Sequence, residues 1–295
     1  MRTGGPERPA ANPTIVEPAP SVGFSYGGRD PALLNRILPH VDVLEVTPDD
    51  LVTVDGDEVR LDDQVVCHLG ELSRHTTIVV HGVGLSIGSH DGCSETYLRV
   101  LSEFLERVDV AWHSEHLGYT TVDGSYLGAM LTLPRTEEVL TVMAERAAAI
   151  RDRFGIPFLL ENVAGLLPDP GGDHTPAGFL NALAANAGCG LLLDLYNLEC
   201  DAANQGFDIR GFLDELDLSA VGELHVAGGV QRLGLQLDVH SRLTKPTTRE
   251  LAARARAARP DVTTVFELLP QAVSIVGHEA IATELHSLCD AFVAA

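Results

Sequence analysis

Short apolar runs that end in a metal-capable side chain recur along most of this 295-residue chain. The run 77–80 is followed by His81, for example, and the run 158–160 is followed by Glu161. The polar residues at the ends of such runs are His81, His113, Glu115, His116, Glu161, Asp194, His225 and Glu267. Continuous apolar runs bounded in this way are typical of buried parallel strands. If such strands close into a barrel, all of their C-terminal ends, and these polar residues with them, meet at one face.

The chain alternates strand-like runs with helix-like segments eight times. We expect strands at 22–26 and 43–47, and further strands that end at His81, near Ser114, at Glu161, at Asp194, at His225 and near Glu267. We expect helices at about 32–38, 62–73, 94–107, 136–154, 176–187, 209–216, 247–258 and 279–293. Thr136 is the expected N-cap of the fourth helix. Eight alternations without a break in composition favour a single (β/α)8 TIM barrel over an open doubly wound sheet.

That barrel would form one catalytic domain over residues 22–295, behind a flexible leader at 1–21 that is rich in Pro, Ala and Gly. Neither a GxGxxG nor a GxxxxGK phosphate-binding loop occurs in the sequence. Long connections follow the third to sixth strands, at 82–92, 117–134, 162–175 and 195–208. Because loops of this length in a compact domain are usually functional, we expect them to shape the barrel mouth.

Composition excludes several classes of partner. The formal net charge of −22 argues against nucleic acid and anionic membranes as partners, because both would repel the chain. No apolar stretch is long enough to span a bilayer, and the N-terminus has no apolar signal segment. The five cysteines are scattered and show no CxxC spacing, so we expect reduced thiols in a cytoplasmic protein.

The residues at the strand ends predict a metal site. The mixture of His81, His116, Glu161, Asp194, His225 and Glu267 suits Fe(II), Mn(II) or Zn(II). Asp238 and His240 add a pair whose side chains would point the same way from an extended segment. A single histidine at a strand end is more often a hydrogen-bonded structural residue than a ligand. Two buried carboxylates are more telling, because without a cation their burial costs several kcal/mol.

The same motifs resemble a known family. Its pattern is carried here by His81–Ser86, Ser114–Leu117, Leu160–Val163, Leu193–Asn197, Glu223–Gly228, Asp238–His240 and Phe266–Glu267, in this order. Together they resemble the multinuclear non-heme iron-dependent oxidative enzymes, the family of the methanobactin-biosynthesis oxidase. The resemblance covers about residues 22–270 and implies a xylose-isomerase-like TIM barrel that holds two or three irons.

The resemblance also implies an activity. Members of this family use O2 to modify residues, often cysteine, in ribosomally made precursor peptides, and many work with a small partner protein that presents the peptide. Carried over by motif, His81, His116 and Glu161 would hold one iron. Glu161 would bridge to a second iron that is also held by Asp194, His225 and Glu267, and Asp238 and His240 would help to bind a third. Asn162 and Asn197 would orient ligands beside the catalytic Glu161, and the long loops would form a peptide groove.

This chain departs from the family pattern in three motifs, so the resemblance is to a divergent member. Thr47 replaces a histidine after the second strand, Gln205 replaces a histidine in an Asn-His-Gly motif, and Gly229 replaces a histidine that follows Ala-Gly. Three imidazoles are thus absent from the expected mouth.

Two other functions fit the same residues. A divalent-metal sugar isomerase or hydrolase on the same barrel would also use Glu, Asp and His at strand ends. Isomerases usually place a lysine near the sugar, and the only lysine, Lys245, lies beyond the seventh strand rather than at a strand end. The second alternative is a non-catalytic, metal-holding scaffold of a biosynthetic complex.

Overall fold

Eight parallel strands form a closed barrel in the computed structural model, which describes residues 21–56 and 58–293. The barrel strands are β1 (Val22–Ser25), β2 (Val43–Val46), β5 (Thr77–Gly82), β6 (Val110–His116), β9 (Phe158–Glu161), β10 (Gly190–Asp194), β11 (Val221–Val226) and β14 (Thr263–Phe266). They pair in chain order, and β14 returns to pair with β1 and close the ring. The predicted eight-stranded parallel barrel is therefore confirmed. The expected leader at 1–20 lies outside the described residues, whereas Ser21 is buried and hydrogen bonds Thr263.

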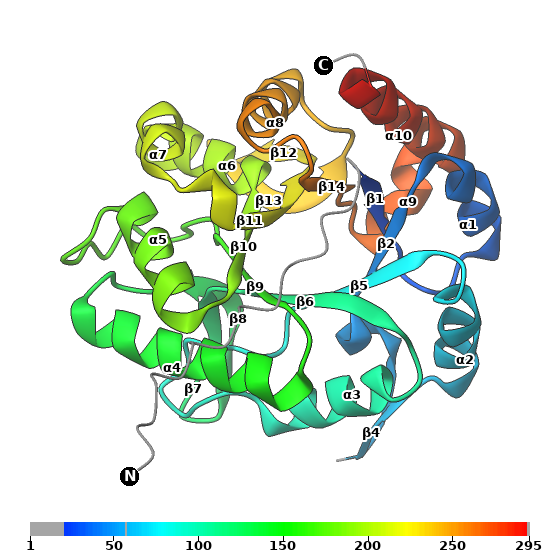
Figure 1. The fold of residues 1–295 in the computed structure, drawn as a ribbon, viewed down its shortest axis with the longest axis horizontal. Coiled ribbons are helices and arrows are strands. Elements are labelled where there is room, and N and C mark those ends of the chain that lie inside the picture. Colours follow the sequence, from blue (N-terminus) through cyan, green and yellow to red (C-terminus); the bar gives the residue numbers. More distant parts are fainter. Residues whose placement is uncertain (1–20, 57, 294–295) are drawn as a thin grey trace, which may run out of the picture.

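Helices surround the strands, as Figure 1 shows. They are α1 (Pro31–Ile37), α2 (Asp63–Leu72), α3 (Glu95–Leu105), α4 (Glu137–Phe154), α5 (Pro176–Ala187), α6 (Leu195–Gln205), α7 (Ile209–Glu215), α8 (Pro246–Ala258), α9 (Pro270–Val276) and α10 (His278–Val293), with short 3-10 turns η1 (Leu38–His40), η2 (Pro48–Leu51) and η3 (Leu218–Ala220). The capping residues explain several boundaries. The Thr136 side chain accepts from Val139 N at the start of α4, as predicted, and Gly155 in a left-handed conformation ends that helix.

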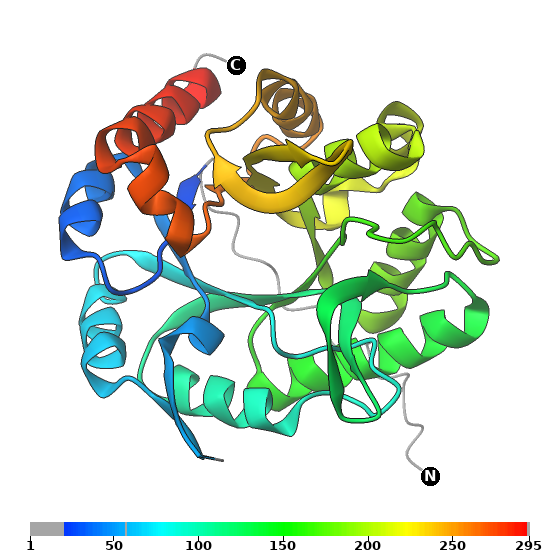
Figure 2. The ribbon, with the colours of Figure 1, turned by 180° about the vertical axis from the view of Figure 1, so that it is seen from behind.

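Three two-stranded hairpins lie outside the barrel in the part of the chain that the structure describes. They are β3 (Val52–Asp55) with β4 (Glu58–Leu61), β7 (Gly118–Val122) with β8 (Ser125–Thr132), and β12 (Gly228–Arg232) with β13 (Leu235–Arg242). Figure 2 views the molecule from the side on which hairpins β7–β8 and β12–β13 lie. Because these hairpins follow β6 and β11 directly, this side is the C-terminal face of the barrel.

Two of the expected loops are regular structure instead. The segment 195–208, expected to be a loop, contains α6, and the segment 117–134 forms hairpin β7–β8. Helix α9 and the other two hairpins were also not predicted. In α6 most of the first turns are buried, polar residues included, so the helix lacks the polar outer stripe that sequence periodicity detects.

Candidate metal centre

The ends of β5, β6 and β9 bring three predicted ligands together. Glu161 Oε2 lies 3.2 Å from His81 Nε2 and 3.1 Å from His116 Nε2. Glu161 and His81 are almost fully buried, whereas the His116 side chain is 19% exposed and faces the barrel mouth. We call His81, His116 and Glu161 the first donor group, because one atom of each lies close enough to share a cation.

A second donor group forms at the ends of β10, β11 and β14. His225 Nδ1 lies 2.8 Å from Glu267 Oε2 and 3.9 Å from Asp194 Oδ2. His240, from β13, approaches the same carboxylates, with Nδ1 at 2.7 Å from Glu267 Oε2 and Nε2 at 3.2 Å from Asp194 Oδ2. All four side chains are buried or nearly so.

The two donor groups are contiguous. Glu161 belongs to the first group and also lies within cation-sharing distance of Asp194 and His225. A further combination joins the two groups through His81, His225 and Glu267. The geometry therefore places Glu161 between two positions that could each hold a cation.

Hydrogen bonds to the other ring nitrogen orient the imidazoles of the first group. His81 Nδ1 lies 2.9 Å from Ser114 Oγ, and the Ser114 hydroxyl also donates to Val80 O, so Ser114 accepts from His81. His116 Nδ1 donates to Gly82 O at 3.1 Å. Both rings thus turn Nε2, the nitrogen free to bind a metal, toward Glu161.

A buried carboxylate performs the same role for His225, and sequence reasoning missed it. Glu45 Oε2 lies 2.9 Å from His225 Nε2, inside the barrel, which leaves Nδ1 facing the second donor group. Glu223 lies 3.8 Å from the same nitrogen and accepts a hydrogen bond from Trp112 Nε1 at 2.7 Å. The available signal was the presence of Glu45 and Glu223 within otherwise apolar strands.

The start of α6 fixes the Asp194 carboxylate. Asp194 is the N-cap of this helix, and its Oδ1 accepts from Asn197 N at 2.7 Å, so that Oδ2 turns toward the donor group. Asn162 exchanges two hydrogen bonds with the Asp194 backbone, at 2.9 and 2.8 Å. Asn197 Nδ2 lies 3.4 Å from Glu161 Oε1. Both asparagines therefore contact the acidic residues that they were predicted to orient.

The side chains of Asp238 and His240, both on β13, lie next to each other. Asp238 Oδ1 lies 3.0 Å from His240 Nε2, but the Asp238 side chain is 35% exposed and belongs to none of the three-residue donor groups among the described residues. His240 has a φ of 25°, a conformation that non-glycine residues adopt only where the surroundings impose it. In contrast, His113 turns away from the mouth and meets Tyr97 of α3 at 3.0 Å.

The charges of these groups are strongly coupled. Burial alone would lower the pKa of His81, but the adjacent Glu161 raises it to about 10. Burial would raise the pKa of Glu161, but His116 and His81 lower it to about 2. The carboxylates also hold the pKa values of His225 and His240 well above the usual range, despite burial. Without a metal, protons on the imidazoles balance the buried carboxylates.

Buried polar atoms at the centre of the cluster fit a cation. Six of them make no well-directed hydrogen bond within the described chain: His81 Nε2, Glu161 Oε2, Asp194 Oδ2, His225 Nδ1, His240 Nε2 and Glu267 Oε2. Buried polar atoms are normally satisfied, so such a convergent set fits cations that groups of these atoms would share. Imidazole nitrogens with carboxylate oxygens are the donors that first-row transition metals prefer.

Two of the three positions that lack the family's histidines are explained by other contacts in the fold. Gln205 Nε2 donates to Gly165 O at 2.9 Å and Leu167 O at 3.3 Å, and its Oε1 accepts from Asp169 N at 3.1 Å. Its side chain therefore fastens the loop after β9 rather than facing the donor groups.

No side chain fits at Gly229. A Cβ there would lie 2.7 Å from Leu237 O and would also collide with the hydroxyl of Tyr196. The Tyr196 ring is buried and packs 5.8 Å from the His240 ring. A phenol thus occupies the space beside the donor groups into which a residue at 229 would project.

A groove leads from the donor groups to the surface. This cavity of about 780 Å³ is lined by His116 and Asp238 at its inner end, by Ala129–Met130 of β8 on one side and by Leu235–Val239 of β13 on the other. The segment 163–168 and Cys200 complete its lining. No lysine or arginine lines it within the described chain, and most of its lining residues are apolar.

Comparisons with known proteins identify similar chains and similar folds. Curated relatives include a UPF0276 protein of Caulobacter vibrioides, 34% identical over 75% of this chain and 78% of its own length. Another is UPF0276 protein PA3283 of Pseudomonas aeruginosa, 31% identical over 77% of each chain. Among solved structures, the D-psicose 3-epimerase of Clostridium cellulolyticum H10 aligns with a TM-score of 0.56 at 13% identity and covers 92% of this chain and 97% of its own. Together with the closed barrel, that alignment confirms the predicted TIM-barrel fold.

Two further findings bear on function. Within the described chain, no helix is both long and apolar enough to cross a membrane. The model of the RiPP precursor modification enzymes MbnB/TglH/ChrH, which modify ribosomally made peptides, matches residues 22–284. The chain belongs to the MbnB/TglH/ChrH family of RiPP precursor modification enzymes.

Proposed function

We propose that this protein is a multinuclear non-heme iron oxidase that uses O2 to modify a cysteine of a ribosomally made precursor peptide. The observation that carries the proposal is the position of Glu161, buried between two donor groups and within reach of both. Family membership supports the peptide substrate. The mixture of imidazole and carboxylate donors supports Fe(II).

Under this proposal each residue has a defined role. His81, His116 and Glu161 hold one iron, and Glu161, Asp194, His225 and Glu267 hold a second; His240 and Asp238 adjoin a third position. Bound iron would supply O2 activation and one-electron chemistry at a position open to substrate. Ser114, Glu45 and the N-terminus of α6 hold the ligands in orientation, so that little reorganisation accompanies metal binding.

The groove supplies access for the peptide. Its inner end is formed by His116, the most exposed member of the first donor group, so a residue in the groove reaches the metal positions from that side. The apolar walls exclude water from the reacting side chain. We also propose a small partner protein that presents the peptide, and a cytoplasmic location. All five cysteines lie within the described residues and none forms a disulfide there, which fits that location.

A sugar isomerase is less well supported. The solved structures of sugar epimerases share only the fold, at 13% identity. Lys245, the only lysine in the sequence, is bound to Glu199 at 2.7 Å and to Gln236 at 3.2 Å. A test that separates the two is whether Mn(II) or Mg(II) supports aldose–ketose exchange without O2.

The proposal is tested by oxygen consumption. Anaerobically iron-loaded protein is mixed with cysteine-containing peptides encoded beside its gene, and O2 uptake and peptide mass are followed together. We expect O2 uptake together with a change in the mass of a peptide. Both should be absent with the Glu161→Gln variant. Metal-loaded protein that consumes no O2 with any of these peptides, although it binds them, would instead support the scaffold function.

A further inference from the structure

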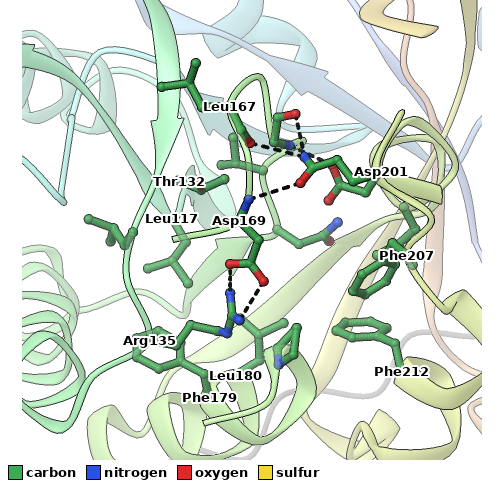
Figure 3. Close-up of a pocket in the computed structure, with 17 residues that line it drawn as sticks. Leu117, Thr132, Arg135, Leu167, Asp169, Phe179, Leu180, Asp201, Phe207 and Phe212 are labelled. Atoms are coloured by element: carbon green, nitrogen blue, oxygen red, sulfur yellow. Dashed lines mark hydrogen bonds and ion pairs between the residues drawn. The ribbon is translucent and has the colours of Figure 1, made fainter. Parts of the chain in front are cut away.

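A second cavity lies beside the groove, on the outer side of the loop that follows β9. This side pocket of about 330 Å³ is formed by the segment Val163–Leu167, the start of α5, the face of α6 and the start of α7. Apolar side chains dominate its walls, among them Leu117, Leu133, Phe179, Leu180, Phe207 and Phe212. Figure 3 shows Phe207 and Phe212 on one side of the pocket and Leu117 on the other.

Most of the polar side chains that line the side pocket already bind other groups of the protein. Arg135 forms a two-pronged ion pair with Asp169, at 2.6 and 2.8 Å, which Figure 3 draws across the pocket. Asp201 Oδ1 accepts from Gly165 N at 2.7 Å. Gln205 is bound to the loop backbone. A charged ligand would therefore compete with the Arg135–Asp169 ion pair, whereas an apolar group would not.

The side pocket and the groove share a wall. Val163, Gly165, Leu167 and Gln205 line both cavities, so one segment of loop separates them. The crest of this segment exposes two leucines, Leu166 at 57% and Leu167 at 56%. A chain that lies in the groove can thus pass over this apolar segment to reach the side pocket.

We propose that the side pocket binds one bulky apolar side chain, of the size of Leu or Phe, from the precursor peptide whose modified residue lies at the inner end of the groove. This inference rests on the proposed function, because it takes the peptide as the ligand of the groove. The volume lies at the lower end of the range of ligand pockets, which fits a side chain better than a whole cofactor. Burial of such a side chain strengthens peptide binding roughly tenfold to hundredfold.

Peptide display on the metal-loaded full-length protein tests the proposal. Two libraries of random peptides are selected, one with a fixed central cysteine and one with serine in its place, on Zn(II)-loaded protein so that no oxidation occurs. We expect enrichment of the cysteine library with an apolar residue at one fixed distance from the cysteine. Cysteine-dependent enrichment without any apolar preference would overturn the side-pocket inference and leave the proposed function intact. The reverse, an apolar preference that does not depend on cysteine, would count against the proposed function.

A matched pair of variants locates the effect. Leu133 lines the side pocket, whereas Leu131, two residues earlier and similarly half-buried, lines neither cavity. Leu133→Asp should remove the apolar preference and weaken binding of a selected peptide at least tenfold, with metal content unchanged. Leu131→Asp should bind that peptide as the wild type does. A preference that survives Leu133→Asp, or is lost equally in both folded variants, would overturn the assignment to this pocket.

Discussion

At the scale of single residues, the cluster depends on groups that orient the ligands as much as on the ligands. Glu45 accepts from His225 Nε2 at full burial and so leaves Nδ1 for a metal. Carboxylates in this position typically contribute 10- to 100-fold to metal affinity. Glu45→Gln should therefore weaken metal binding at the second donor group by about 10- to 100-fold in a competitive chelator titration. The exposed Glu103→Gln serves as control, and equal affinities in the two variants would refute the role of Glu45.

The bridging role of Glu161 gives a second prediction at this scale. Because Glu161 lies within reach of both donor groups, Glu161→Gln should reduce metal content at both principal positions. Asp238→Asn should leave these two positions filled, since Asp238 belongs to neither group. Metal analysis after anaerobic loading measures both variants. Unchanged metal content in Glu161→Gln would contradict the bridging assignment.

Metal uptake should also release protons. Glu161 outweighs burial and raises the pKa of His81 to about 10, so this imidazole is protonated at neutral pH in the metal-free protein. Because a metal ligand must be deprotonated, the metal displaces this proton when it binds. The apparent affinity for the metal should therefore rise between pH 6 and 8 by about tenfold per pH unit for each proton displaced. Calorimetry in buffers of different ionisation enthalpy counts these protons. A binding enthalpy independent of buffer would mean that His81 carries no proton or is not displaced.

At the scale of elements, the loop after β9 is held by α6. Three hydrogen bonds from Gln205 fasten the segment that separates the groove from the side pocket. Gln205→Ala should lower the free energy of local opening by about 1–3 kcal/mol. The amides of residues 163–169 should then exchange roughly 5- to 150-fold faster. Gln271→Ala on the exposed face of α9 is the matched control. If the amides of residues 163–169 exchange at the wild-type rate in both variants, the loop does not depend on the Gln205 side chain.

The elements that sequence reasoning predicted are those with strong local signals. Thr136 at the start of α4 and Thr175 before Pro176 are capping residues, and the barrel strands are continuous apolar runs. Helix α6 was missed because Asn197 and Glu199 are buried in it, against the donor groups and Lys245. Their burial follows from tertiary contacts, which periodicity in one segment does not contain.

The same distinction holds for the site. The predicted ligands could be found because strand order in a closed parallel barrel fixes which residues share a face. The role of Glu45 could not be predicted, because it depends on the imidazole of His225, 180 residues away. The side pocket could not be predicted either, because it forms where α5, α6 and α7 pack together. By resemblance to the family, the residue at 205 was expected at the barrel mouth. Gln205 instead binds the backbone of the loop that follows β9.

At the scale of the whole molecule, an acidic barrel with a net charge of −22 concentrates buried carboxylates and imidazoles at one face. Such a cluster is costly to bury unless a cation or protons compensate it. Metal binding should therefore stabilise the fold as a whole, because the unfolded chain has no preformed site. Thermal unfolding with and without a chelator should show a higher midpoint for the loaded protein. A midpoint unaffected by the chelator would indicate a cluster that holds only protons.

The central claim is that these convergent residues form a multinuclear iron centre. The most direct measurement is metal content by plasma mass spectrometry on protein purified without oxygen, combined with Mössbauer spectroscopy of an iron-57 sample. We predict two or more irons per chain in a coupled cluster. A single zinc or manganese ion per chain, or no bound metal, would contradict the claim.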